Sequence, residues 1–117
     1  MGRLVPDPVP QPVRPGRPVT FTVNDAIPTN FGDSIYLTGS VAELGGWSTD
    51  PGVAIGPMLT PEHPDWFIVA SVPACATFEY KFIRITAGGA VTWENGPNHS
   101  YTAPCGGTDA VTVDWQR

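Results

Sequence analysis

Two tryptophans lie in segments rich in turn-forming residues, close to side chains that form hydrogen bonds. Trp93 stands in "TWENGPN", directly before Glu94 and five positions before Asn98, and Trp47 stands in "LGGWSTDPG". Two glycines and a proline prevent a regular strand in the second segment, so the Trp47 ring has no pleated face to lean on. An exposed flat ring takes apolar C–H faces, while amides and carboxylates take hydroxyl groups. These residue types suit a neutral ligand such as a sugar.

A lysine is expected on the same side of the domain. In "TFEYKFI" the alternation of side chains in a strand separates two faces. The aromatic face, which we expect to be core, carries Phe78, Tyr80 and Phe82. Glu79, Lys81 and Ile83 share the other face, which brings the ammonium of Lys81 to the polar side. The alternative for both loop tryptophans is that they fold back over the core as caps.

The remaining two tryptophans are expected to be structural. Trp66 opens the apolar segment "WFIVASV", where an indole packs beneath the adjoining loop. Trp115 continues the inward alternation of Val111 and Val113, which places it in the core or at its rim.

Short alternating segments separated by turn residues make up most of the chain. "VTFTV", "SIYLTGSV", "WFIVASV", "TFEYKFIRI", "AVTW", "HSYTA" and "AVTVDW" each have the length of a strand. No ten-residue stretch combines helical apolar spacing with freedom from Gly and Pro. The pattern predicts an all-β fold, an immunoglobulin-like antiparallel β-sandwich of about seven or eight short strands.

The beginning of the chain has a different composition. Proline recurs at nearly every second or third position in "VPDPVPQPVRPGRP", which predicts an extended, semi-rigid spacer. We therefore expect residues 1–18 to be a linker or terminal segment and residues 19–117 to be one domain. A spacer in front of a small domain indicates a module excised from a larger protein.

Composition limits the classes of partner. Only 15% of the 117 residues are charged and the net charge is −5, so the chain lacks the basic surface that nucleic acids and anionic membranes require. No apolar run approaches the roughly 20 residues of a membrane-spanning helix. The first ten residues lack the apolar middle of a signal peptide, so we expect any export signal to lie outside this sequence.

Cys75 and Cys105 each follow a short turn-like segment and fit no spaced metal or redox motif. A disulfide that pins two loops is one interpretation, since small exported domains are commonly stapled in this way. Two unrelated buried thiols are the other.

Catalytic and metal sites are not predicted, and neither is a cofactor. The carboxylates that glycoside hydrolysis would need are limited to Glu79, Glu94, Asp109 and a few loop acids. His63 and His99 stand in separate loops and are expected at the surface. A competing hypothesis is a fibronectin- or immunoglobulin-type interaction module, with the two loop tryptophans anchoring a protein partner.

Four blocks, in this order and spacing, resemble the family 20 carbohydrate-binding modules. The blocks are "IYLTGSVAELGGW", "FEYKFIRI", "VTWENGPNHSYTAP" and "TVDW", and the resemblance runs from about Val19 to Trp115. These modules are the starch-binding domains of glucoamylases, cyclodextrin glycosyltransferases and several amylases. The resemblance implies an extracellular, non-catalytic module that binds starch, malto-oligosaccharides and cyclodextrins and targets an attached catalytic domain to starch.

The resemblance also implies two glucan sites. The first would be a two-tryptophan platform, and by motif its residues are Trp47, Lys81, Trp93, Glu94 and Asn98. In the second site, members often have tyrosines where this chain has Phe31 and Leu59. Phenylalanine loses a hydroxyl and leucine loses the stacking face, so we expect the second site to be weak or absent.

Overall fold

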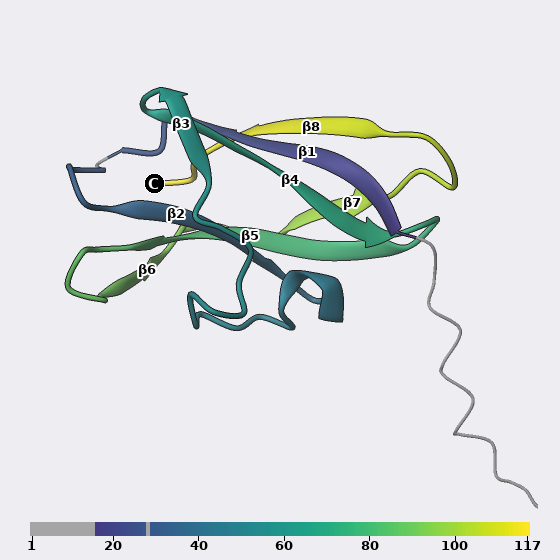
Figure 1. Cartoon of the computed structure of the whole chain (residues 1–117), viewed down its shortest axis with the longest axis horizontal. Coiled ribbons are helices and arrows are strands. Elements are labelled where there is room, and N and C mark those ends of the chain that lie inside the picture. Colours follow the sequence, from purple (N-terminus) through teal and green to yellow (C-terminus); the bar gives the residue numbers. More distant parts are fainter. Residues whose placement is uncertain (1–15, 28) are drawn as a thin grey trace, which may run out of the picture.

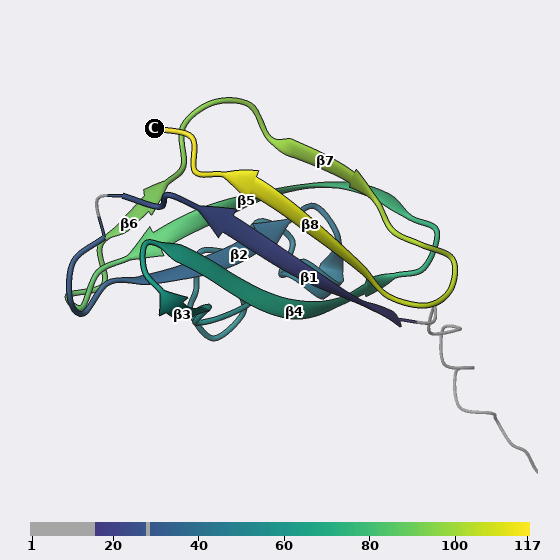
Figure 2. The same ribbon diagram turned by 90° about the horizontal axis from the view of Figure 1, so that it is seen from above.

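The chain forms two β-sheets packed face to face, with the strands joined by both short turns and longer loops (Figures 1 and 2). This computed structural model describes residues 16–27 and 29–117. The strands are β1 (Gly16–Asn24), β2 (Ser34–Gly39), β3 (Leu59–Glu62), β4 (Asp65–Pro73), β5 (Thr77–Ile85), β6 (Val91–Trp93), β7 (His99–Thr102) and β8 (Asp109–Asp114). In this part of the chain the one helical element is the short 3₁₀ turn η1 (Ala42–Leu44), and no helix is long and apolar enough to cross a membrane.

One sheet has the strand order β3-β4-β1-β8, and the other has β2-β5-β6 with β7 also paired to β5. The predicted all-β sandwich is confirmed. Two details differ from the expectation. The β1–β8 pair is parallel, so the sandwich is not wholly antiparallel. The edge strand β3, "LTPE", was not predicted because it is only four residues long and contains a proline, which leaves no clear alternation.

The first strand starts before the expected domain boundary. β1 begins at Gly16, and Arg17 and Pro18 pair with Val72 and Ser71 of β4. The folded domain thus takes up the last three residues of the predicted spacer, while the rest of that spacer lies outside the described residues.

The core forms between the inner faces of the two sheets. Val19, Phe21 and Val23 of β1 are fully buried. Opposite them lie the aromatic side chains of β5, where the rings of Phe21 and Tyr80 meet edge to face at 5.1 Å. Phe78 and Phe82 are buried beside Tyr80, as the alternation predicts. Trp66 is also buried and Trp115 packs partly against the same core, in agreement with their expected roles.

The outer face of β5 is covered as well. Ile83 and Ile85 form a second apolar cluster with Ala54, and Tyr36 packs against it. Ala54 belongs to the long segment between η1 and β3, which is tied to β2 by paired backbone hydrogen bonds between Leu37 and Ile55. This covering segment carries Trp47, so the second cluster holds one predicted ligand-binding residue against the sheet that carries the others.

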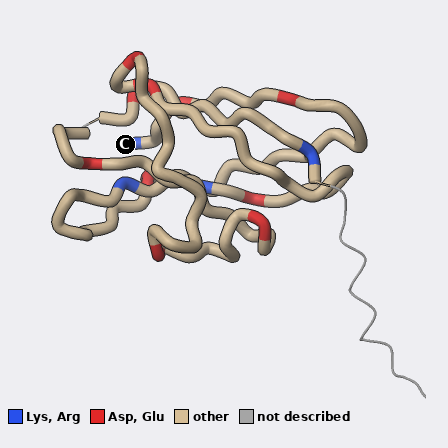
Figure 3. Tube along the Cα trace, viewed as in Figure 1, with Lys and Arg blue, Asp and Glu red and all other residues tan. Residues whose placement is uncertain are grey.

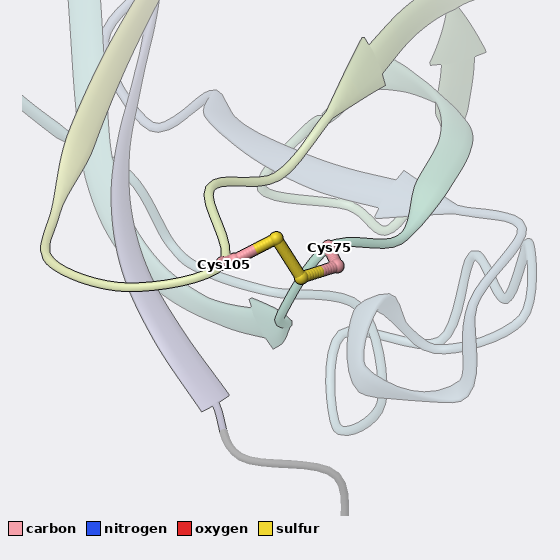
Figure 4. The surroundings of a disulfide bond; sticks show 2 residues. All are labelled: Cys75 and Cys105. Carbon is pink, nitrogen blue, oxygen red and sulfur yellow. A yellow bond between two sulfur atoms is a disulfide. The ribbon is translucent and has the colours of Figure 1, made fainter.

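A disulfide joins Cys75, in the turn between β4 and β5, to Cys105, in the loop between β7 and β8 (Figure 4). The two Cα atoms are 4.4 Å apart, and the bridge spans a sequence separation of 30 residues. It connects the two sheets at the end of the sandwich away from β6 (Figure 1).

Candidate functional site

The structure brings Trp47 and Trp93 together. Their ring centroids are 6.2 Å apart and the ring planes are inclined by 51°. Trp93 is 38% exposed and Trp47 is partly exposed. Both rings are thus accessible to solvent, and they form a tilted pair rather than a flat strip.

The position of Trp93 follows from strand pairing. Trp93 is the last residue of the edge strand β6 and lies opposite Ile83 of β5. Residues that face each other in antiparallel strands share a face of the sheet. Trp93 therefore lies on the outer face, the face that also carries Lys81, two positions before Ile83.

Trp47 reaches the same face through an unusual turn. Gly45, Gly46 and Trp47 all have positive φ angles, of 88°, 56° and 67°. Trp47 also donates its backbone N–H to the Gly39 carbonyl oxygen at 2.8 Å, which ties the turn to the end of β2. A bulky residue with positive φ is uncommon and costs about 1–3 kcal/mol, so the surrounding packing must fix this conformation.

Lys81 holds the loop that follows Trp93. Its Nζ donates to the carbonyl oxygens of Glu94 at 2.8 Å and Gly96 at 2.6 Å. Lys81 as a whole is only partly exposed. Because an ammonium has three donors, one N–H remains beyond these two bonds.

Asn98 is exposed at the far end of the same loop. Its Nδ2 donates to Glu79 Oε1 at 2.9 Å, which fixes the plane of the amide. Among the described residues, none donates to its Oδ1. The amide therefore presents an acceptor at the surface.

Glu94 differs from the other four predicted residues. It is only 1% exposed, and its carboxylate points into the domain. Oε1 accepts the backbone N–H of Phe82 at 3.1 Å and lies 2.8 Å from His99 Nε2. An enclosed carboxylate with these partners is not accessible to a ligand, so we assign Glu94 to the framework beneath the platform rather than to the contact surface.

The ionisation of Glu94 reflects this environment. Burial by itself raises the pKa of a carboxyl group, but the hydrogen bonds from His99, Gln116 and Phe82 outweigh burial here. The pKa of Glu94 consequently lies below its ordinary value, and the group is a carboxylate at neutral pH.

His99 and Gln116 are participants that the sequence did not reveal. His99, expected at the surface, is partly buried and stacks on Tyr80 with ring centroids 5.0 Å apart. Gln116 follows the last strand and donates both its backbone N–H and its Nε2 to Glu94 Oε2. Both residues act as partners of the buried Glu94. The sequence carries only a weak signal for them, because a glutamate in a turn that contains Gly and Pro does not look buried and therefore does not call for buried partners.

The second predicted site has a separate location. The Phe31 ring is fully exposed and borders a hollow of about 320 Å³ that Trp66 and His63 also line. Leu59, on β3, is 57% exposed but does not line this hollow. The structure thus places Phe31 at a concave surface and Leu59 on the exposed edge strand β3, outside that hollow.

Within the part of the chain that the structure describes, no cluster of three or more His, Cys, Asp or Glu side chains is arranged to hold a metal ion. Among the described residues, acidic positions are distributed over loops and strands, and the few basic positions are separated from one another along the trace (Figure 3).

Comparison with known proteins identifies the family of the domain. Residues 17–113 match the family described as "Starch binding domain". The chain is 50% identical over 101 residues to the cyclomaltodextrin glucanotransferase of Paenibacillus macerans, an alignment that covers 84% of this chain and 14% of that protein. The chain therefore spans about one seventh of the length of this relative.

Two solved structures extend the similarity to the fold. The γ-cyclodextrin glucanotransferase of the alkalophilic Bacillus clarkii matches with a TM-score of 0.80 and 44% identity, covering 87% of this chain and 15% of that one. The family 20 module of the maltotetraose-forming amylase from Pseudomonas saccharophila matches with a TM-score of 0.69 and 27% identity, covering 84% of this chain and 99% of that one. The chain belongs to the starch-binding domain family, the non-catalytic carbohydrate-binding modules of family 20 that occur in amylolytic enzymes.

Proposed function

We propose that this domain binds α-1,4-glucan chains on a platform formed by Trp47 and Trp93. The observation that carries the proposal is the tilt of the pair, 51° at a ring separation of 6.2 Å. An α-1,4-linked chain curls, so successive glucose units present their C–H faces at an angle. Two inclined rings fit such a chain, whereas a flat strip of rings would suit a straight one.

The energetics favour a moderate affinity. Each ring contact contributes roughly 0.5–1.5 kcal/mol beyond area burial, by analogy with aromatic pairs. Each hydrogen bond that replaces water contributes about 1 kcal/mol net. After the loss of rigid-body freedom, an affinity on the micromolar scale remains for a soluble oligosaccharide.

The polar residues divide into two roles. The exposed Asn98 amide, with its oxygen unbonded among the described residues, is the group best placed to bond a glucose hydroxyl. Lys81 supports the Trp93 loop and has one N–H left for a ligand. Glu94 is enclosed and supports the loop after Trp93 from inside the domain, without contacting the ligand.

We further propose that the domain directs an attached amylolytic enzyme to starch and also binds cyclodextrins. The matched region is only 14% of the Paenibacillus macerans relative, which is consistent with a catalytic region elsewhere in the parent protein. Weak binding suffices for a tethered module, because the granule surface supplies a high effective concentration. The Cys75–Cys105 disulfide favours an extracellular protein.

The second glucan site is proposed to be weak. Phe31 offers an exposed ring without a hydroxyl, and Leu59 offers an apolar side chain without a stacking face. Stacking at this position would depend on a single ring.

The deciding experiment is a titration with β-cyclodextrin that follows tryptophan fluorescence in wild type and in Trp47→Ala. We expect a saturable change in wild type and a strongly weakened one in the variant. A parallel pull-down on granular starch tests the polysaccharide itself. An unchanged signal in both proteins, together with no retention on starch, would refute the proposal and favour a protein-interaction role for the indole pair.

A further inference from the structure

The loop between Trp93 and Asn98 is hydrogen-bonded to Gln116, which follows β8. Gln116 Nε2 donates to the Pro97 carbonyl oxygen at 3.0 Å and to Glu94 Oε2 at 3.2 Å. The Gln116 carbonyl oxygen accepts the backbone N–H of Asn95 at 2.9 Å. Gln116 therefore bonds Glu94, Asn95 and Pro97, three of the four residues of the loop.

The fourth loop residue is also fitted to Gln116. Gly96 has a φ of 84°, and a Cβ added there would collide with Gln116 Oε1. From the other side, Lys81 Nζ bonds the carbonyl oxygens of Glu94 and Gly96. The loop is thus held between a lysine from β5 and a glutamine from the segment after β8.

His99 completes the arrangement from the β7 side. Its Nε2 lies 2.8 Å from Glu94 Oε1, and a ring nitrogen that faces a carboxylate carries the proton. The same Nε2 lies 3.3 Å from Gln116 Nε2, but a protonated nitrogen cannot accept a bond from that amide. Glu94 Oε1 and Oε2 therefore accept from three separate segments: the backbone of Phe82 in β5, His99 in β7 and Gln116 after β8.

A buried carboxylate is stable only when its partners satisfy it, and losing one partner leaves a costly charge. The loop can therefore move only by breaking several of these bonds together. Trp93 immediately precedes the loop and Asn98 immediately follows it. The bonds that fix the loop consequently fix both residues with respect to β5, and the segment that carries Trp47 packs on the outer face of the same strand.

We infer that Gln116 and His99 are positioning residues for glucan binding: through the buried Glu94 carboxylate they hold Trp93 and Asn98 in the geometry that a glucan recognises, without touching the ligand. The inference rests on the proposed function of the Trp47–Trp93 platform. It assigns to the segment after β8 a part in a site that otherwise comes from the β5–β6 sheet and the covering loop.

The test compares Gln116→Met, which keeps the length of the side chain and removes the two bonds donated by Nε2 to Glu94 and Pro97, with Val111→Ala. Val111 lies in β8, packs against the core and makes none of the hydrogen bonds that hold the loop, so its truncation should lower stability without removing those bonds. Two quantities are measured: the dissociation constant for maltoheptaose by calorimetry, and the exciton couplet of the two indoles by circular dichroism. The couplet reports the mutual orientation of Trp47 and Trp93 and needs no ligand.

We expect Gln116→Met to bind maltoheptaose about tenfold more weakly and to lose most of the couplet. Val111→Ala should retain the affinity and the couplet, even though its melting temperature is lowered to a similar extent as that of Gln116→Met. His99→Phe, which keeps a ring on Tyr80 and removes the bond to Glu94, should weaken binding in the same direction, and it provides the test if Gln116→Met does not fold.

The inference would be overturned if folded Gln116→Met and His99→Phe kept the wild-type affinity and couplet. It would also be overturned if Val111→Ala lost affinity and couplet to the same extent. Failure of the wild-type protein to bind maltoheptaose would instead refute the proposed function. An intact couplet in Gln116→Met would then refute the positioning role as well.

Discussion

Trp47 and Trp93 are 46 positions apart in the chain, yet their ring centroids lie 6.2 Å apart on the surface of the domain. One comes from a left-handed turn in the loop that covers β5, and the other ends an edge strand paired to β5. Because each element supplies one ring, glucan binding at the proposed site should require both Trp47 and Trp93.

Replacing either platform ring is expected to weaken binding with little effect on folding. Trp47→Ala and Trp93→Ala should each reduce the affinity for β-cyclodextrin about tenfold or more, or roughly 1.4 kcal/mol, because stacking area is lost. The melting temperature should change by only a few degrees, since both rings are partly exposed. Calorimetry and thermal unfolding measure the two quantities.

The control is Phe78→Leu. Phe78 is 3% exposed and belongs to the core. Its replacement should lower the melting temperature and leave the affinity for β-cyclodextrin unchanged. The reverse pattern, with binding lost in Phe78→Leu and retained in the platform variants, would contradict the assignment.

The disulfide is expected to stabilise the domain without contributing to binding. Closing a loop of about 30 residues stabilises a chain by roughly 3–4 kcal/mol through the entropy of the unfolded state. The double variant Cys75→Ser/Cys105→Ser should lose about that much in urea unfolding. Its affinity for β-cyclodextrin should stay within about twofold of wild type, because the bridge lies at the end of the sandwich away from β6. A loss of affinity in a fully folded double variant would argue against this separation.

Acid should destabilise the domain partly through Glu94. The pKa of Glu94 is lower in the folded protein than its ordinary value, so the unfolded chain binds more protons in acid. The stabilisation is therefore complete above the ordinary carboxyl pKa and is lost as the pH falls through the folded pKa. Urea unfolding between about pH 7 and pH 3 should show a steeper loss of free energy in wild type than in Glu94→Gln.

Asp109 provides an internal reference for that experiment. Its hydrogen bond from the Tyr101 hydroxyl also lowers the pKa of its carboxyl group, but it is present in both proteins. The difference between the two pH profiles therefore isolates Glu94. Parallel profiles would mean that the Glu94 carboxylate does not contribute to the acid sensitivity.

Restoring an aromatic ring at Leu59 is expected to strengthen the second site. Leu59→Tyr adds a stacking face on β3, and two occupied sites on one domain increase retention on a polysaccharide. Binding to granular starch should tighten by about two- to fivefold, with little change for a short oligosaccharide. Val69→Tyr, at another exposed apolar position of the same sheet, is the control and should have no such effect.

The sequence by itself determined the class of fold and the family, and it predicted which residues form the platform. Period-two alternation placed Phe78, Tyr80 and Phe82 in the core, because a strand can bury only alternate side chains on one face. Gly- and Pro-rich surroundings kept Trp47 and Trp93 outside regular core strands, and the ordered blocks identified the family. The edge strand β3 was not predictable, because four residues with a proline give no period.

Only the tertiary structure decided how these residues divide their roles. Glu94 stands in a turn-rich segment, and nothing local indicates that its carboxylate is enclosed; the enclosure requires Phe82, His99 and Gln116 to converge from three segments. The tilt of the two indoles likewise depends on the left-handed turn at Trp47 and the register of β6 against β5. Local sequence determines which side chains a strand buries, but convergence of distant segments is a property of the packed chain.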